Sequence, residues 1–375
     1  MKLRYRSLIV LLILGFVSIC ALPARAQVGD IGRILQASTN DANILVKEYL
    51  KPFGSGFGAG LNTGWTNAAK PHKTLGFDLT VSSGLAVVPS ADKTFDVTQI
   101  GLQELELESG PSILQTINGA DDVQTSSLAV YQDINNDGQQ EKILGFDMPN
   151  GTGFGYVPAP QLKLGVGIIK DTELMLRVVP KVSIQDYGTF KQFGVGAKHG
   201  INQWLPGGKL LPVDLSLMAG YTSQTLTSDF RLTGEDVVVD PNNTENPYTN
   251  QSEIWDGQKA EIQSDAFSID ALVGKTLPVI SIYGGVGIET SSLSISTPGT
   301  YPTIGENPDF QSDPNNEKPL IVKTIDEPID VNMDGKNSVH ALAGFRLRFA
   351  IFHISASYKL AKYSTFNAGF GISFR

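Results

Sequence analysis

The stretch that decides the fold closes the chain and reads Phe366-Asn367-Ala368-Gly369-Phe370-Gly371-Ile372-Ser373-Phe374-Arg375. Apolar residues occupy every second position, and the residues between them are Asn, Gly, Gly, Ser and Arg. Successive side chains of a strand point to opposite faces, so this pattern predicts a β-strand with one apolar face and one polar or bare face. At the end of an exported chain such a strand is typical of an outer-membrane β-barrel.

The start of the sequence predicts export. Residues 1–26 combine a basic beginning, an apolar run over residues 8–19 and an Ala-Arg-Ala cleavage site, as in a cleaved signal peptide. The apolar run is too short to cross a bilayer. The single cysteine, Cys20, lies in this segment, and the bulky Ile19 before it disfavours a lipoprotein site. We therefore expect a mature chain without thiol chemistry.

The charge of the chain excludes one class of partner. The formal charge is −9, and loss of the four basic residues of the signal takes it to −13. Nucleic-acid binding needs a basic face, so we expect no nucleic acid partner.

Alternation at period two recurs through most of the chain after residue 74. A soluble β-sandwich also alternates, with its apolar face turned inward. The alternating segments are about nine to fourteen residues long, which suits tilted membrane strands better than sandwich strands. Short connections also alternate with long polar ones near residues 89–155, 230–258 and 297–336. Barrels combine short periplasmic turns with long external loops in this way.

We therefore predict an all-β fold, a transmembrane antiparallel up-and-down β-barrel of about 10–14 strands over residues 71–375. The predicted location is the outer membrane of a Gram-negative bacterium, with the three long loops outside. Residues 27–70 differ in kind, because apolar residues recur there at helical spacing up to Leu50 and four glycines follow between residues 54 and 60. This segment predicts short helices and an irregular glycine-rich stretch. It is either a plug in the lumen or a periplasmic arm.

Two loop segments match the first half of a calcium-binding loop. Oxygen ligands at alternate positions before a glycine can converge on a hard cation. The bidentate glutamate of a complete EF-hand is absent, and a tight Asp-Gly turn is the alternative. Apart from calcium we expect no cofactor. The candidate calcium ligands are Asp133, Asn135, Asp137 and Glu141 in the first segment, and Asp330, Asn332 and Asp334 in the second.

Charged residues of both signs fall on the strand faces predicted to avoid lipid. A charge facing the bilayer midplane costs roughly 2–4 kcal/mol, so these side chains should point inward. They either line a selective pathway or form a salt-bridge network that fills a narrow barrel. The predicted lumen-lining residues are Asp78, Lys163, Arg177, Lys181, Asp214, Asp270, Glu289, Arg346 and Arg348.

No catalytic motif is present in the sequence. The four histidines are widely separated, and the chain has no HExxH, GxSxG or phosphate-loop pattern. We therefore expect no enzymatic activity.

Three segments carry a resemblance to a known family. They are PQLKLGVG at 160–167 with TELMLR at 172–177, FGVGAKH at 193–199, and LPVDLS at 211–216. The chain resembles an uncharacterised family of Gram-negative outer-membrane barrels, classed as a domain of unknown function. The resemblance implies a barrel of the same build and brings no substrate. A helical segment before a barrel is also similar, more distantly and in architecture alone, to transporters of the long-chain fatty-acid type.

Two functions remain open. The first is passage or binding of a small amphiphilic or hydrophobic solute, indicated by the N-terminal segment and the glycine-rich inner faces. The alternative is a non-transporting surface or structural barrel whose acidic loops bind calcium or a partner. Expected partners are outer-membrane lipid and, through the C-terminal strand, the barrel-assembly machinery. Arg375 departs from the commonest barrel ending, in which an aromatic residue is last.

Overall fold

A computed structural model of the chain describes residues 38–133, 138–184, 188–229, 232–233, 255, 257–309 and 320–374. The predicted signal peptide and most of the second long loop therefore lie outside the described residues. No helix in these ranges is long and apolar enough to cross a membrane.

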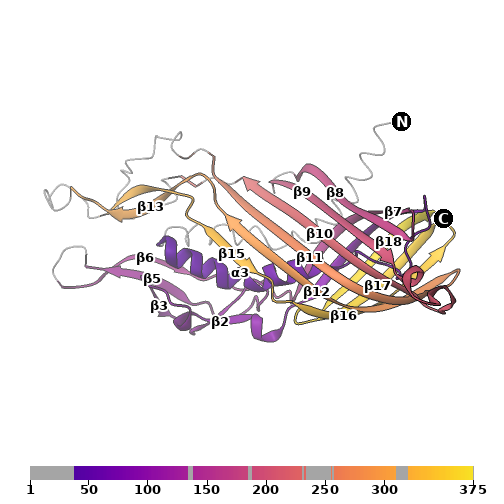
Figure 1. Ribbon diagram of the computed structural model, residues 1–375. Coiled ribbons are helices and arrows are strands. Elements are labelled where there is room, and N and C mark those ends of the chain that lie inside the picture. The colour runs from indigo at the N-terminus through magenta and orange to yellow at the C-terminus, as the bar shows by residue number, and fades with distance from the viewer. Residues whose placement is uncertain are drawn as a thin grey trace.

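Ten strands form a closed antiparallel sheet, drawn from indigo β1 to yellow β18 in Figure 1. Each strand pairs with the barrel strand that precedes or follows it in the chain, and β1 pairs with β18 to close the ring. The register places Phe77 opposite Phe374. This confirms the predicted up-and-down barrel. The strands are β1 (Phe77–Val87), β7 (Tyr156–Ile168), β8 (Thr172–Ile184), β9 (Gly188–Gly200), β10 (Asp214–Asp229), β11 (Lys259–Thr276), β12 (Ile280–Ser296), β16 (Val339–Phe349), β17 (Phe352–Leu360) and β18 (Thr365–Phe374).

The two faces of the barrel wall settle its environment. Along β1 the apolar residues point outward and the polar ones inward, so Leu79 is 37% exposed and Asp78 is 0% exposed. The same inversion holds on β18, where Phe370 is 55% exposed and Ser373, on the opposite face of the strand, is buried. An apolar outside around a polar inside is the pattern of a barrel that spans a membrane.

Four shorter connections lie at one end of the barrel, which we call the turn end. Residues 169–171, 277–279 and 350–351 lie there, together with the β9–β10 connection that contains η4 (Asn202–Trp204) and η5 (Gly208–Leu210). The opposite end, the loop end, carries the long connections predicted from the sequence. Figure 1 shows β10, β11 and β12 extending toward these connections.

The first and third long connections are folded, and their described residues form a cap at the loop end. Residues 88–155 contain small sheets, and residues 297–338 add a hairpin and a strand that pairs with β12. The elements of the cap are η1 (Ser90–Asp92), β2 (Thr94–Asp96), η2 (Val97–Gln99), β3 (Leu105–Ser109), β4 (Ile113–Gln115), β5 (Ser127–Gln132), β6 (Glu141–Asp147), β13 (Thr300–Glu306), β14 (Leu320–Asp326) and β15 (Asp330–Asp334).

The α-helix of the described residues, α3 (Thr39–Leu61), joins the cap to the barrel. Ser38 caps its first turn by accepting a hydrogen bond from the backbone N–H of Asp41, and the Asp41 carboxylate accepts backbone N–H groups of residues 103–105 in the cap. The first half of α3 packs in an apolar core around Leu45, Val46 and Leu128. The N-cap serine, a signal that is visible in the sequence, thus fixes where α3 begins.

The expected irregular glycine-rich stretch is wrong, because all four glycines lie inside α3. Isolated helices disfavour glycine, yet close tertiary packing on bare backbone compensates here. Gly54 and Gly58 share one side of the helix and Gly56 and Gly60 share another. A periodicity argument based on apolar side chains cannot detect a helix whose contact faces have no side chains.

Candidate functional site: the closed lumen

The second half of α3 enters the barrel between two walls. An added Cβ at Gly58 would lie 2.4 Å from the Cβ of Ser291 on β12. On the other side, one at Gly60 would lie 2.6 Å from the Cβ of Ala159 on β7. The helix therefore fits between these walls because it is bare on both sides.

After α3, residues 62–76 pass along the lumen to the start of β1 at the turn end, and we call them the threaded segment. Trp65 is fully buried in this segment, and its ring lies against the glycine faces of β9 and β10. An added Cβ at Gly220 would lie 2.5 Å from the Trp65 ring. The Arg177 guanidinium lies 3.7 Å from the ring centroid on another side, in cation–π contact.

Buried cations of the barrel wall bind main-chain carbonyls of this threaded segment. Arg177 donates to the carbonyls of Leu61 and Thr63 at 2.7 and 2.5 Å. Lysines on three other strands make equivalent contacts, so side chains of the wall donate to backbone carbonyls of this segment and of the end of α3. These contacts are Lys163 to Trp65 (3.0 Å), Lys198 to Ala68 (3.0 Å) and Lys359 to Ala59 (2.9 Å).

Acidic side chains neutralise these cations near the turn end. Glu173 lies 3.0 Å from Lys198 and 3.0 Å from His72, which belongs to the threaded segment. Asp78 lies 3.6 Å from Lys163 and 3.1 Å from His353. Lys163 and Lys198 are thus each paired with a carboxylate inside the barrel, as a buried charge requires.

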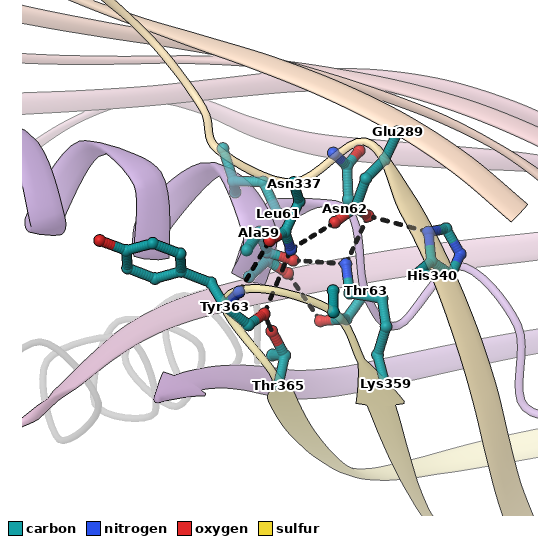
Figure 2. A network of polar contacts seen from close by, with 12 residues as sticks. Ala59, Leu61, Asn62, Thr63, Glu289, Asn337, His340, Lys359, Tyr363 and Thr365 are labelled. Carbon is teal, nitrogen blue, oxygen red and sulfur yellow. Dashed lines mark hydrogen bonds and ion pairs between the residues drawn. The ribbon is translucent and has the colours of Figure 1, made fainter. Parts of the chain in front are cut away.

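A second network surrounds Glu289 at the inner end of α3, as Figure 2 shows. Glu289 pairs with Lys359 at 2.5 Å and accepts a hydrogen bond from Asn337 at 2.7 Å. His340 lies 3.6 Å from Glu289 and 2.5 Å from Asp270. Lys359 therefore links this network directly to the carbonyl of Ala59 on α3.

The network continues toward the loop end through Tyr363. Its backbone N–H donates to the side chain of Asn337 at 2.8 Å, and its hydroxyl donates to Asp92 at 2.7 Å. Burial and the hydrogen bond to Asp92 raise the pKa of the Tyr363 phenol. Burial alone would raise the pKa of Asp92, but hydrogen bonds from Lys336 and Tyr363 lower it below the ordinary 3.8. Asp92 is therefore held as a carboxylate.

Six of the predicted lumen-lining residues are buried inside the barrel, namely Asp78, Lys163, Arg177, Asp270, Glu289 and Arg346. The inward position expected of Lys181 is wrong, because the register of β8 shifts between Val179 and Val182 and leaves Lys181 exposed. Arg348 is also exposed, beside the β16–β17 turn, where it donates to Pro278.

Asp214 is half-buried at the turn end, 3.6 Å from Lys70, and so does not join the buried networks. The sequence prediction omitted Glu173, Lys198 and the histidines at 72, 340 and 353, all of which are buried. Alternation could have found the four strand residues, because each has the parity of an inward-facing residue of its own strand. Glu173 shares a face with Arg177, Lys198 with Gly196, His340 with Arg346, and His353 with Lys359.

The two predicted calcium segments have different outcomes. Asn135 and Asp137 lie outside the described residues, and Asp133 accepts the backbone N–H of Gly138 between β5 and β6. Glu141 begins β6. The second prediction is wrong, because Asp330, Asn332 and Asp334 lie on the exposed face of strand β15, where alternate side chains run in a row and cannot converge. No metal-binding cluster of His, Cys, Asp or Glu occurs in the described parts of the chain.

Comparison with known proteins identifies the family. The model of a family of unknown function, DUF6588, matches residues 2–374. The chain belongs to this family. The resemblance predicted from the sequence is thus confirmed, and a search of curated proteins finds no match.

Solved structures with some similarity to this DUF6588 chain are outer-membrane barrels. The ferric-catecholate import receptor Fiu from E. coli K12 is 12% identical, with 78% of this chain and 55% of that chain covered and a TM-score of 0.24. The translocator domain of autotransporter NalP from Neisseria meningitidis is 8% identical, with 81% and 90% covered and a TM-score of 0.24. A mutant Rh. blastica porin is 7% identical, with 80% and 100% covered and a TM-score of 0.15. The fold assignment rests on the strand pairing.

Proposed function

We propose that this protein is a closed outer-membrane barrel that acts at the cell surface through its cap, and that it is not an open diffusion pore. One observation carries the proposal: buried cations on four strands of the wall hold carbonyls of the chain that threads the lumen. The proposal includes no catalytic activity.

The energetics favour a threaded segment that stays in place. Hydrogen bonds to charged groups contribute about 1.5–3 kcal/mol each, and removing a partner leaves the cation unpaired in a buried site. The apolar core around Leu45 also holds the first half of α3 in the cap. Emptying the lumen would therefore disrupt both the cap and the ion-pair networks.

Single-channel recording in planar bilayers tests the proposal. The wild-type chain should give no steady ion current, because the threaded segment fills the lumen. The double substitution Lys163→Met and Arg177→Met should produce open events by weakening the hold on residues 61–65. Arg348→Met, which alters an exposed charge, is the matched control and should stay closed. Steady wild-type conductance would refute a closed barrel.

The surroundings of the barrel follow from the same proposal. Outer-membrane lipid would cover the apolar outer face, which includes Phe345, Phe366 and Phe370. The barrel-assembly machinery would bind β18 before that strand pairs with β1, since both edges of β18 are paired in the finished sheet. The acidic charge disfavours a nucleic acid partner.

Passage of a small amphiphilic solute is a second candidate function. It requires that the threaded segment be displaced from the lumen. Its support is that hydrogen bonds, which water can replace, make many of the contacts of residues 61–69 with the wall. A disulfide can test it. An added Cβ at Gly54 would lie 3.4 Å from the Cβ of Leu293, close to the spacing of a disulfide.

The substitutions Gly54→Cys and Leu293→Cys would tie α3 to β12. If solute passage requires displacement of α3, oxidation should stop uptake by whole cells and a reductant should restore it. The single Gly54→Cys variant controls for the oxidant. Uptake that is identical in the oxidised and reduced double variant would exclude this route.

A further inference from the structure

A polar cleft of about 170 Å³ opens at the loop end, where α3 meets the cap. Its charged lining is Glu48 and Lys51 on α3, Asp92 on η1, and Lys336 on the connection between β15 and β16. At roughly 30 Å³ per water, the cleft holds about five or six water molecules. Sites between separate structural elements are common places for small ligands to bind.

Two lysine side chains face this cleft with unused donors. Lys51 pairs with Glu48 at 2.7 Å, and Lys336 pairs with Asp92 at 2.7 Å. Each ammonium has three N–H donors and is paired with one carboxylate. Lys362 also acts on Asp92 through its charge. Together with Lys362, three lysines therefore stand against the two carboxylates Glu48 and Asp92 at this cleft, in a chain whose net charge is −9.

The cleft is also connected to the lumen. From Lys336 the contacts run through Asp92 and the Tyr363 hydroxyl, and then through Asn337 to Glu289. Figure 2 shows the inner part of this path, which ends where Lys359 binds the carbonyl of Ala59. The other wall of the cleft is α3 itself. One wall of the cleft is thus part of the helix, and the other contacts the helix through this path.

We propose that this cleft binds a small oxyanion, a phosphate or a carboxylate, between Lys51 and Lys336, and that binding tightens the hold of the cap on α3. The proposal names a ligand class for the surface role proposed above and rests on it. Lysine ammoniums bind phosphate and carboxylate oxygens through charge-assisted hydrogen bonds. A ligand that contacts only the native arrangement stabilises it by mass action. The volume of about 170 Å³ is large enough for a small anion.

Calorimetric titration of the full chain in detergent, with inorganic phosphate and separately with acetate, tests the site. Wild type should bind phosphate saturably and more tightly than acetate, because a dianion can bridge two ammoniums. The double variant Lys51→Met and Lys336→Met should weaken phosphate binding at least about tenfold. The control double variant Lys259→Met and Lys323→Met removes the same charge from exposed positions of the loop end and should change binding less than about twofold.

Repeating the titration with and without anionic phospholipid in the micelles separates a free anion from a lipid phosphate. Lipid that competes with inorganic phosphate identifies the headgroup as the source, and no competition identifies a free solute. Absence of saturable binding by wild type would overturn the site, as would equal weakening in both double variants.

Hydrogen exchange measures the effect on α3. Phosphate should slow amide exchange over residues 55–61 in wild type. Tyr363→Phe removes the hydroxyl that contacts Asp92 and keeps both lysines, so phosphate should still bind while the slowing is lost. Unchanged exchange in wild type would overturn the link to α3. Conductance is recorded without phosphate, so failure of the closed-barrel proposal and failure of the anion site are separate results.

Discussion

The cap and the lumen hold successive parts of the N-terminal segment by different means. In the cap, α3 packs its apolar side chains among Leu128, Phe146 and Met333. In the lumen, cations of the wall hold the following residues by their carbonyl groups. The difference follows from the surroundings, because the cap buries its apolar groups away from water while the barrel wall turns its apolar groups toward lipid. The side chains that point into the barrel are therefore polar, and they need hydrogen-bond or ion-pair partners there.

Glycine marks the boundary between these two regions. Gly56 lies against Val157 and Ala86, and Gly58 lies against Ser291, at the level where the helix leaves the cap. On the cap side of this boundary, apolar side chains of similar size should be interchangeable. At the boundary itself, the helix fits only because it has no side chains on the sides that face β7 and β12. The following predictions test the comparison, beginning with the largest effect.

Arg177→Met should destabilise the lumen most. The substitution leaves the carbonyls of Leu61 and Thr63 without their donor, at roughly 1–3 kcal/mol each, and removes the contact with the Trp65 ring. Urea unfolding in detergent, followed by tryptophan fluorescence, measures the loss in free energy of unfolding. Arg348→Met should stay within about 0.5 kcal/mol of wild type. Equal effects of the two substitutions would show that the threaded segment does not depend on Arg177.

Leu45→Ala should affect the cap. Leu45 is fully buried in the apolar core, and a cavity of this kind costs about 2–5 kcal/mol. Limited proteolysis should cut the cap faster, while the gel mobility of the folded barrel stays the same. Val123→Ala, at a position that is 38% exposed, is the control. Loss of the folded barrel in Leu45→Ala would mean that cap and lumen form one cooperative unit.

Gly58→Ala should be harmful and Gly54→Ala should be tolerated. The added methyl at residue 58 would overlap Ser291, at a cost of about 1–3 kcal/mol, whereas the nearest atom at residue 54 is 3.4 Å away. Alanine also favours the helix by roughly 0.5–1 kcal/mol, so Gly54→Ala should be neutral or stabilising. Thermal unfolding on gels compares the two. Adding Ser291→Gly to Gly58→Ala should restore part of the loss, and no restoration would exclude this contact as the cause.

The smallest expected effect is the pH dependence of local stability around Asp92 in the cap. The pKa of Asp92 is lower in the folded chain than its ordinary 3.8, so its contribution to stability is present above that value and is lost as pH falls through the folded pKa. The protection of the amides of residues 90–96, measured relative to their intrinsic exchange rate at each pH, should therefore fall below about pH 4, close to the ordinary aspartate value. Asp92→Asn should remove that pH-dependent fall in protection. A variant with the same pH profile as wild type would assign the effect to another carboxylate.

The sequence determined the barrel on its own, because strand periodicity is a local property. The alternation in Phe366–Phe374 and in the segment near Leu79 predicted which side chains face lipid, and the spacing of connections predicted which end carries the loops. The same alternation correctly predicted that six charged side chains point into the barrel. Lys181 did not, because a register shift is set by the pairing of β8 with β9 and leaves no mark in the alternation of one strand.

Tertiary structure alone decided what fills the lumen. The four glycines of α3 do not by themselves predict a helix. Their helical conformation depends on packing against Ala159 and Ser291, which are far away in the chain. Likewise, Asp330 to Asp334 matched a calcium loop in composition, but pairing with β12 made them a strand. The partner of a buried charge is also set by the closed sheet, because Glu173 and His72 are about a hundred residues apart in sequence and meet only once the barrel has closed around its threaded segment.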